Sequence, residues 1–581
     1  MTAKPKTSGL INCILLADGT ELSASIEIIS VTVYKQVNRI PYAIVTLVDG
    51  NPAKQTFKNS ENDKFVPGKD LEIKAGLYTE SSTIFKGVIT KIGLKVTNKT
   101  SMMTVECEDK AGKLTIDKQT KIYHEQKDTD IFKSLISGTG ISLTSDQTST
   151  THEQIIRYNS TAWDFLLMRA QANGMVVIPN DNSLSVKKPD TSSSPKMTLE
   201  FGTNVLSFET EMNAKNQRTS VETASWDGAS VSVNEATASA STSDPGNISI
   251  DDLASKLSTG DNIKYPGMLP SDELKTWTDA MSLHHKLSKI QGTYKCMGIS
   301  EITPGDMVEI KGIGNRFSDT FYVTGIHHEI IGGGWTTDIQ VGFPAKMFYE
   351  QFDYQHQKAG GLLPAFNGLM CGKVVSIAND PNSEYRVKVE IPTLGSEVTL
   401  WARYTTPDAG KARGVVFYPE VDDEVVLGFL DDDPRYPIIL GSLYSSSNTP
   451  PSEPEEENGE KGVYSKNKLN LLFNDTNETI SIETPNKNII TVDNKNNEIK
   501  ISDSSKNSIK LSSSGIELSS ASNLKINASG NIDIKATGNL KLDGANVDLA
   551  AQASFSAKGN AGANIESSAI TVVKGSLVQI N

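Results

Sequence analysis

The chain has 581 residues and 37% hydrophobic content, which is enough for three or four domains with separate cores. Its formal net charge is −14. Because the chain is acidic and its Lys and Arg residues form no extended cluster, we do not expect it to bind nucleic acid.

The cysteines and the N-terminus indicate a chain made in the cytoplasm. Cys13, Cys107, Cys296 and Cys371 form no CxxC motif and no Cys/His cluster, so we expect four buried thiols and neither disulfides nor structural zinc. The N-terminus lacks the apolar core of a signal peptide, and no run approaches the ~18 apolar residues that span a bilayer. Export by the general secretory route is therefore not expected.

Residues 1 to about 115 are predicted to form short strands. Apolar and polar residues alternate in segments such as 42–48, and the dipeptides Asp49-Gly50 and Pro67-Gly68 mark turns. This pattern predicts a β-barrel or a β-sandwich.

The hydrophobic period becomes helical between residues 120 and 180. Residues 130–136 have the pattern of a short amphipathic helix. A second helix is predicted after Thr161, because Thr161 and Asp164 match a capping box. It is predicted to end at Asn173-Gly174, where Gly suits the left-handed cap position.

The remainder of the first 360 residues contains a predicted loop, a long helix and further strands. Residues 229–263 are rich in Ser, Thr, Ala and Asp and are interpreted as a surface loop. A helix is predicted from Ser271 to about Ile290, with one face formed by Leu274, Trp277, Met281 and His284. From residue 292 to 342 the strand pattern returns, with a turn at Pro304-Gly305-Asp306. Two β regions around a helical middle indicate one hub-like unit, residues 1–360, built from non-contiguous pieces.

A small barrel and a linker are predicted next. Residues 361–445 contain five short strands, which fit an OB-fold barrel; they are predicted at 372–377, 385–391, 398–404, 424–430 and 437–440. Residues 446–460 are acidic and contain proline, which is typical of a solvated linker.

The strongest internal signal is a repeat in residues 461–581. Apolar pairs spaced two residues apart recur at steps of seven to eight residues from Ile509 onward. Because side chains of a strand alternate between faces, each pair is predicted to point inward. Earlier pairs include Leu469/Leu471, and the core is predicted to contain Ile516, Leu518, Leu524, Ile526, Ile532, Ile534, Leu540 and Leu542.

One inward strand of about three residues per step cannot form a core by itself. Neighbouring turns of the same chain or neighbouring chains must cover it. The spacing is compatible with a monomeric solenoid or with a triple-stranded β-helix formed by a trimer. The expected fold is therefore mainly β, with hub β-barrels, an OB-fold barrel and a C-terminal β-helix.

Three groups of motifs resemble one known family. In the hub these are Ser160-Thr161-Ala162-Trp163-Asp164-Phe165-Leu166, Pro304-Gly305-Asp306 and residues 321–328, FYVTGIHH. In the barrel region they are Leu400-Trp401-Ala402-Arg403 and residues 419–429, PEVDDEVVLGF. With the repeat, they resemble the spike proteins of contractile injection machines, which fuse the hub and tail-lysozyme scaffold of T-even phages and include the type VI secretion VgrG proteins.

The resemblance implies a homotrimeric structural spike rather than an enzyme. Such a spike joins the inner tube and the baseplate to a needle that punctures the target membrane transiently. A PAAR-like tip protein is implied as partner, with Val578, Ile580 and Asn581 at its interface, together with effector cargo. Assembly in the cytoplasm within the injection particle is expected, followed by release or ejection to the extracellular space or a target cell.

The subtype stays open between three systems. Residues 431–441, DDDPRYPIILG, and residues 360–364, GGLLP, are similar to extracellular systems of the antifeeding-prophage and Photorhabdus virulence cassette type. A type VI spike is the alternative. A phage envelope-degrading hydrolase is a further reading, although the interval 446–460 leaves no space for a catalytic domain.

Several residues with reactive side chains are interpreted as structural. The pairs His284-His285 and His327-His328 are adjacent in sequence, whereas metal ligands usually lie two apart on strands and three or four apart on helices. The acidic runs 422–424 and 431–433 lie at strand entries and turns of the predicted barrel. We therefore expect no catalytic residue, no cofactor and no metal site.

Overall fold

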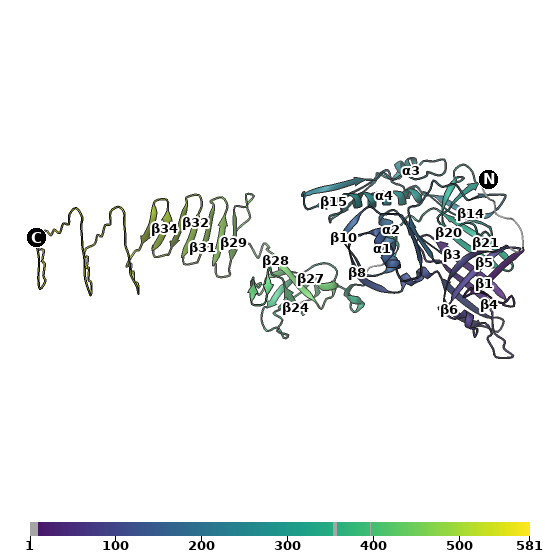
Figure 1. Ribbon diagram of the computed structural model, residues 1–581, viewed down its shortest axis with the longest axis horizontal. Helices are drawn as coiled ribbons and strands as arrows, with labels where there is room; N and C mark the ends of the chain where they lie inside the picture. The colour runs from purple at the N-terminus through teal and green to yellow at the C-terminus, as the bar shows by residue number, and fades with distance from the viewer. Residues whose placement is uncertain (1–9, 79, 353–356, 396, 581) are drawn as a thin grey trace. The chain divides into compact units, whose positions relative to one another are not determined.

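The computed structural model describes residues 10–78, 80–352, 357–395 and 397–580 (Figure 1). The chain divides into two compact units. The first contains Met1–Met370, Leu400–Arg403 and Leu427–Ile438, and the second contains Cys371–Thr399, Tyr404–Val426 and Ile439–Asn581. Strands are the dominant element, as expected. No helix in the described ranges is both long and apolar enough to cross a lipid bilayer.

A sheet of 13 strands organises the first unit. Strand β20 (Thr320–Ile331) pairs antiparallel with β3 (Ile28–Gln36) on one side and with β21 (Gly334–Val341) on the other. Outward from β21 follow β18 (Ile290–Met297) and β14 (Val205–Met212); outward from β3 follow β4 (Tyr42–Val48), β7 (Ser101–Glu108), β6 (Ser82–Val96), β5 (Asp70–Leu77), β1 (Ile11–Ala17) and β2 (Thr20–Glu21). Strand β19 (Met307–Lys311) pairs β20 and β13 (Met197–Glu200).

Alternating burial explains why this sheet joins segments distant in sequence. On β3, Val31 and Val33 are fully buried, and the residues between and beside them face the other side. Ile330 of β20 lies opposite Val31, and Trp335 of β21 packs into the same core. Ile330 and Trp335, from residues 290–341, therefore share a core with the N-terminal strands.

The predicted helices are confirmed close to their expected bounds. Thr161 is the N-cap of α2: its hydroxyl accepts a hydrogen bond from the Asp164 amide at 3.0 Å and donates to the Asp164 carboxylate at 2.7 Å. Gly174 follows the helix with φ of 67°. The helices are α1 (Asp128–Ile136), α2 (Ala162–Ala172), α3 (Ile250–Leu257), α4 (Ser271–Leu287) and α5 (Phe348–Gln351).

The interpretation of residues 229–263 as a surface loop is wrong. They contain β16 (Ser232–Thr237), α3 and β17 (Asp261–Tyr265). Both strands flank β15 (Val221–Asp227) in a three-stranded sheet. The polar sequence conceals these strands because their order comes from pairing with β15, and because only some side chains, such as Ile250 and Ala254 of α3, are buried.

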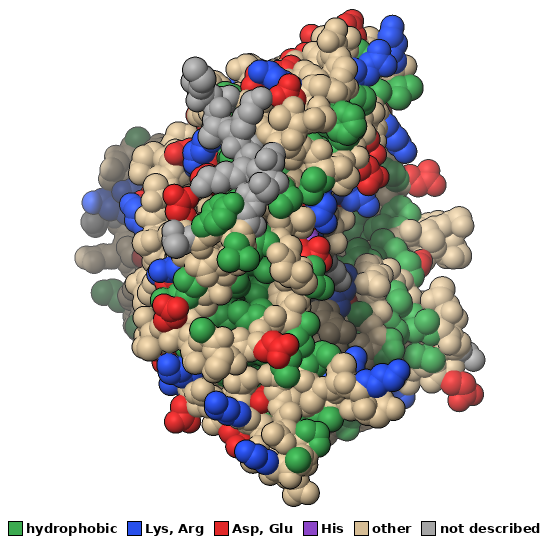
Figure 2. Space-filling model, turned by 90° about the vertical axis from the view of Figure 1, so that its right-hand side faces the viewer, with side chains coloured by type: hydrophobic (Ala, Val, Ile, Leu, Met, Phe, Trp, Pro, Cys, Tyr) green, Lys and Arg blue, Asp and Glu red, His purple; other side chains and the backbone are tan. Residues whose placement is uncertain are grey.

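Two further small sheets complete the first unit. One pairs β8 (Lys118–Lys127) with β10 (Thr151–Thr161). The other contains β9 (Ser142–Ser145), β11 (Val176–Asn180) and β12 (Ser183–Lys187). Figure 2, which views the molecule from the right of Figure 1, shows hydrophobic side chains interspersed with acidic and basic side chains. This face therefore presents mixed charge rather than a field of one sign.

The predicted five-stranded barrel is confirmed as a closed barrel. Val374, Val387, Val389, Val425 and Ile439 are all fully buried. The strand order is β22 (Met370–Ser376), β23 (Val387–Glu390), β24 (Thr399–Tyr404), β28 (Pro437–Ser442) and β27 (Glu424–Phe429), and a short hairpin pairs β25 (Ala409–Gly410) with β26 (Arg413–Gly414).

The expectation that all four cysteines are buried is wrong for one of them. Cys107 and Cys296 are buried and Cys13 is half-buried, whereas Cys371 is exposed. Cys371 lies on β22 between partly buried Met370 and buried Gly372, so strand alternation turns it outward from the barrel. All four are free thiols.

The capping geometry of α2 makes Thr161→Ala a test of local stability. Removing the hydroxyl leaves the Asp164 amide without its cap, which costs about 1 kcal/mol. Amide hydrogen exchange in the first turn of α2 should become about fivefold faster. Thr161→Ser keeps the hydroxyl and should retain wild-type exchange; equal acceleration in both variants would show that the cap is not the cause.

Candidate functional site in the C-terminal repeats

Residues 460–519 form a seven-stranded antiparallel sheet in which each strand pairs with the next (Figure 1). Each of the turns from Lys468 onward contains a residue with positive φ, which reverses the chain within a few residues. These residues are Lys468, Glu478, Lys487, Asn497, Lys506 and Gly515. The strands are β29 (Glu460–Tyr464), β30 (Asn470–Asn474), β31 (Thr479–Glu483), β32 (Ile489–Asp493), β33 (Glu498–Ser502), β34 (Ser508–Ser512) and β35 (Gly515–Ser519).

The ladder register aligns the apolar pairs into two columns on one face. Ile480 lies opposite Val492, and Ile482 lies opposite Ile490. The same pattern continues across every later ladder. The first column contains Phe473, Ile480, Val492, Ile499, Leu511 and Ile516, and the second contains Leu471, Ile482, Ile490, Ile501, Ile509 and Leu518.

The register corrects one predicted pair and the expected mode of pairing. Leu471 pairs in the columns with Phe473, while Leu469 precedes β30. In residues 460–519 the strands also bond to strands of their own chain, so hydrogen bonding there does not require other chains. The reason is the turn length: each connection is short enough for a tight antiparallel turn.

The apolar columns are incompletely covered by the described chain. Ile482 remains 50% exposed and Ile490 41% exposed, although both lie inside the ladder. Residues between the pairs, such as Lys510 and Glu517, lie on the opposite face, as predicted, and Lys510 forms an ion pair with Glu498 at 2.6 Å. A sheet with one polar and one exposed apolar face is incomplete until the apolar face is covered.

Residues 520–580 have a different structure. They are extended segments separated by bends at 521–522, 529–530, 537–538, 545, 552–553, 560–561, 568–569 and 576–577, and they contain no strand ladder within the described chain. The bends lie between successive apolar pairs of the repeat. Six of the eight predicted core residues lie in this segment: Leu524, Ile526, Ile532, Ile534, Leu540 and Leu542, all exposed. The other two, Ile516 and Leu518, lie on β35.

The predicted tip residues lie at the end of this segment. Ile580 is 90% exposed and Val578 is 46% exposed. Asn581, the third predicted tip residue, lies outside the described residues. No assignment of these residues to a partner follows from the single chain.

The carboxylates at 422–423, weighed as candidate catalysts, and Asp433, weighed as a calcium ligand, are engaged in local structure. Asp422 forms an ion pair with Lys373 at 2.7 Å, and the Asp423 carboxylate accepts a hydrogen bond from the Glu420 amide at 2.8 Å. Asp433 binds the Arg435 guanidinium at 2.7 Å, and this hydrogen bond holds the pKa of Asp433 below its usual value. These contacts fit turns and strand entries rather than a hydrolytic pair.

The adjacent histidines of β20 point to different surroundings. The His328 ring is buried and its Nδ1 lies 2.9 Å from the Thr337 hydroxyl; burial lowers the pKa of His328 to about 3. His327 stacks on Tyr34 with ring centroids 4.1 Å apart, and its Nδ1 lies 3.0 Å from Asp338. Among the described residues no group of three or more His, Cys, Asp or Glu side chains has the arrangement of a metal site.

A buried ionic network in the first unit has no sequence signature. Asp128 of α1, which is 1% exposed, accepts two hydrogen bonds from Arg169 of α2 at 2.7 and 2.9 Å. Arg169 also contacts Glu273 of α4 at 3.1 Å, and His152 of β10 lies 3.1 Å from Asp128. The partners are far apart in sequence, so only tertiary structure assembles them.

Within the network, the charge of Arg169 compensates the burial of the Asp128 carboxylate. Burial raises the pKa of Asp128, but hydrogen bonds from His152 and Arg169 outweigh this effect and hold the pKa below the usual carboxyl range. Asp128 is therefore ionised at neutral pH, and Arg169 provides the charge that makes its burial tolerable.

Two family models match the chain. The first, described as Alg8 N-terminal domain, matches residues 7–332, more than half of the chain. The second, described as type VI secretion system/phage-baseplate injector OB domain, matches residues 370–444, the range of the closed barrel.

Curated relatives are similar over short segments. The actin cross-linking toxin VgrG1 of Vibrio cholerae is 33% identical over 96 residues, which cover 15% of this chain and 9% of that protein. The type VI secretion system spike protein VgrG5 of Pseudomonas aeruginosa is 40% identical over 73 residues, covering 12% of this chain and 9% of that protein. The matches thus span about a tenth of the relatives' length.

Two solved structures are similar to the chain at low sequence identity. A 43 kDa tail protein of prophage MuSo2 from Shewanella oneidensis has a TM-score of 0.45 at 12% identity, covering 58% of this chain and 99% of that chain. An E. coli type VI secretion component similar to T4 bacteriophage tail proteins has a TM-score of 0.39 at 14% identity, covering 74% and 99%.

The ionic network predicts that Arg169→Met destabilises the first unit by about 3 kcal/mol, because Asp128 and Glu273 lose their cation while remaining inside. Since the folded pKa of Asp128 is depressed, its stabilisation is complete above the unfolded value of about 3.9 and is lost as the pH falls. Urea unfolding at pH 7, followed by tryptophan fluorescence, captures the whole effect.

Arg218→Met is the matched control for this measurement. Arg218 pairs with Asp261 at 2.8 Å, but both side chains are more exposed. Its loss should cost less than about 1 kcal/mol. Equal costs for both variants would contradict a special role of burial at Asp128.

Proposed function

The chain belongs to the family of the Alg8 N-terminal domain, and its residues 370–444 match an injector OB domain. From this premise we propose its function. The chain is the structural spike of a contractile injection machine. The observation that carries this proposal is the repeat segment that follows the barrel, with its two apolar columns and its unpaired extended segments. The exposed apolar columns and the unpaired segments both require other chains to cover them, and a needle formed by several chains would provide this cover.

The geometry supports copies of the same chain as the covering partners. A monomeric solenoid would pair successive coils of its own chain, whereas residues 520–580 form no such ladder. The preceding columns lie on one antiparallel sheet in which each strand pairs with the next, rather than on a coil. Three chains arranged around an axis would cover all columns and remove every open strand edge at once, which also suppresses aggregation.

The proposed work of the spike is mechanical. Its hub, residues 1–360, attaches to the inner tube and baseplate, and its repeats form a needle that crosses the target membrane transiently when the sheath contracts. Interchain ladders resist axial load because shear must break many hydrogen bonds together. We include effector cargo and a PAAR-like tip protein at Val578, Ile580 and Asn581 as proposed partners.

We infer a structural rather than an enzymatic role. The carboxylates at 422–423 and 433 are held by Lys373, a backbone amide and Arg435, and these contacts support a structural role for them. The similarity to type VI spike proteins supports the same reading.

Three settings stay open for the proposed machine: a type VI system, an extracellular system and a phage tail. Similarity to type VI spikes favours a type VI system, whereas the motifs at 360–364 and 431–441 favour an extracellular one. In each setting we propose assembly in the cytoplasm within the particle, followed by release or ejection. Membrane-complex genes beside the spike gene would identify the type VI setting.

The trimer is tested by replacing Ile532 and Ile534 with Asp. The wild type should have a mass of about 188 kDa by light scattering, three times the 62.8 kDa chain. In the variant, unpaired carboxylates would lie inside the needle at a cost of several kcal/mol each, so the needle should fray and become protease-sensitive.

Lys535→Asp is the matched control because its parity places it on the outer face. It should assemble and resist protease like the wild type. A monomeric wild type with a protease-resistant repeat would instead support a solenoid.

The tip assignment is tested by deleting residues 570–581. The deletion removes the last apolar pairs, so a co-expressed PAAR-like protein should no longer be recovered by pull-down, while the spike remains trimeric. One cap per three chains is expected for the full-length spike. Retention of the cap by the truncated spike would contradict the assignment.

A further inference from the structure

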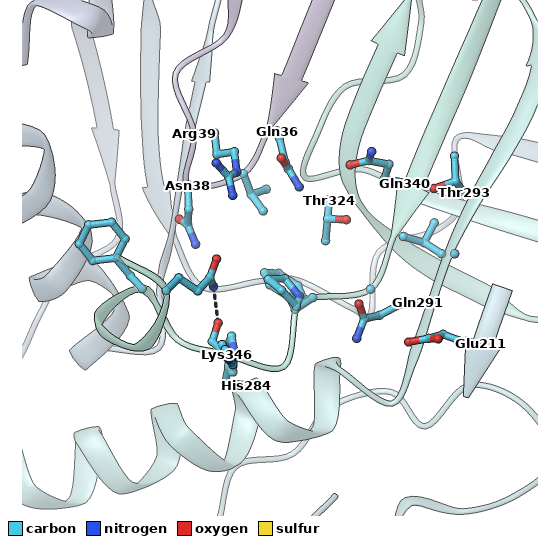
Figure 3. A pocket seen from close by; sticks show the side chains of 18 of the residues that line it. Gln36, Asn38, Arg39, Glu211, His284, Gln291, Thr293, Thr324, Gln340 and Lys346 are labelled. Atoms are coloured by element: carbon cyan, nitrogen blue, oxygen red, sulfur yellow. Dashed lines mark hydrogen bonds between the residues drawn. The ribbon is translucent and has the colours of Figure 1, made fainter. Parts of the chain in front are cut away.

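A groove of about 390 Å³ lies in the first unit, at the ends of five strands of the large sheet (Figure 3). Strands β3, β20, β21, β18 and β14 contribute Gln36, Thr324, Gln340, Gln291 and Glu211, respectively. Helix α4 contributes His284 from the other side. The groove exists because the chain turns away after β21 at Gly342, whose φ of 77° and close approach to the Ile290 carbonyl exclude a larger residue.

The lining offers hydrogen-bonding groups that the described chain does not use. The side chains of Gln36 and Gln340 have no hydrogen-bond partner among the described residues, whereas Nε2 of His284 is buried, with the backbone of Pro344 and Ala345 beside the ring. Burial, and next the neighbouring His285, lowers the pKa of His284 to about 4, so the ring is neutral at physiological pH. Carboxamides and a neutral imidazole each combine donor and acceptor atoms, as peptide groups do.

Charges of opposite sign occupy opposite ends of this lining. In the view of Figure 3, Arg39 and Lys346 lie toward one end and Glu211 toward the other. Glu209, two residues before Glu211 on β14, adds a second carboxylate to the lining. All four side chains are exposed, and none forms an ion pair within the described ranges. Arg39 lies over the Phe352 ring, with 5.4 Å between the guanidinium carbon and the ring centroid.

The groove also has an apolar part. Val37, Val341 and Phe343 are buried residues that contribute to its wall. Such a wall accommodates a small apolar side chain between the charged ends. Neutral glycans would leave the charged ends unused, and a polyanion would be repelled by Glu209 and Glu211.

We propose that this groove binds an extended peptide segment of a partner protein that carries one acidic and one basic residue a few positions apart. The acidic residue lies against Arg39 and Lys346, the basic residue lies against Glu209 and Glu211, and the peptide groups between them bond to the carboxamides. This goes beyond the proposed spike function, since the groove lies in the hub and is remote in sequence from the repeats.

The test uses an array of pentapeptides with one Glu and one Lys at every pair of positions, in both orders, on a Ser/Val background. Binding of the labelled full-length chain is compared with binding to the uncharged background peptide. One order of charges should bind about tenfold more strongly than both the reverse order and the background. Equal binding to all peptides overturns the proposal.

A second set of measurements reverses the charges of the groove residues. Arg39→Glu with Lys346→Glu, or Glu209→Lys with Glu211→Lys, should each reduce binding to the background level. All four substitutions together should restore binding but prefer the opposite order of Glu and Lys. Because these side chains are exposed, reversal buries no charge, and an unchanged melting temperature verifies the fold.

Glu61→Lys with Lys99→Glu is the matched control, since both are exposed residues of the same unit outside the groove. This control should retain wild-type binding and preference. If the groove reversals instead dissociate the oligomer without any effect on peptide binding, the groove is a contact between copies of this chain and the proposal is wrong.

Discussion

The constraint on which this molecule depends is that a β-strand must satisfy its backbone groups and cover its apolar face. The first unit meets this constraint internally, because β20 lies between β3 and β21 and buries residues on both sides. The barrel meets it by closure. The repeats meet the constraint only in part. Residues 460–519 pair their backbone groups but leave apolar side chains such as Ile482 half exposed. Residues 520–580 neither pair their backbone groups in a ladder nor cover their apolar side chains within the described chain.

This gradient has a consequence for assembly. The antiparallel sheet of residues 460–519 has its turns and ladders within one chain, so it can set the register of the apolar columns before other copies arrive. The extended segments 520–580 have regular bends but no ladder among the described residues, and in the proposed assembly they would become ordered by association. A needle whose base is ordered first and whose remainder follows by association would avoid the mispairing to which long uniform repeats are prone.

The hub combines rigid and open features. Its buried network joins α1, α2, α4 and β10 through Arg169, which makes the helical part a single block against the sheet. The groove beside that block keeps exposed charges and unused carboxamides at the strand ends. The stability of the helical part and the peptide binding proposed for the groove thus involve different residues of the same unit.

Several local features follow from the sequence because neighbouring residues cause them. The cap at Thr161 depends on Asp164 three residues later, and the barrel strands depend on alternation within six residues. The bends of the repeat coincide with its small and polar residues. The resemblance of the barrel motifs to spike proteins also agrees with the matched injector OB domain.

Other features were decided by tertiary structure, because their causes lie far apart in sequence. The order in 232–265 comes from pairing with β15, Leu471 rather than Leu469 joins the apolar columns because of the ladder with β31, and Cys371 is exposed through its position on β22. The Asp128–Arg169–Glu273 network and the groove between Arg39 and Glu211 combine residues that no spacing connects. The sequence by itself determined the strongly patterned elements, their periods and the repeat. Pairing across the fold decided the register and the sites, since a strand's partner is set by burial and hydrogen bonding with residues that lie elsewhere in the chain.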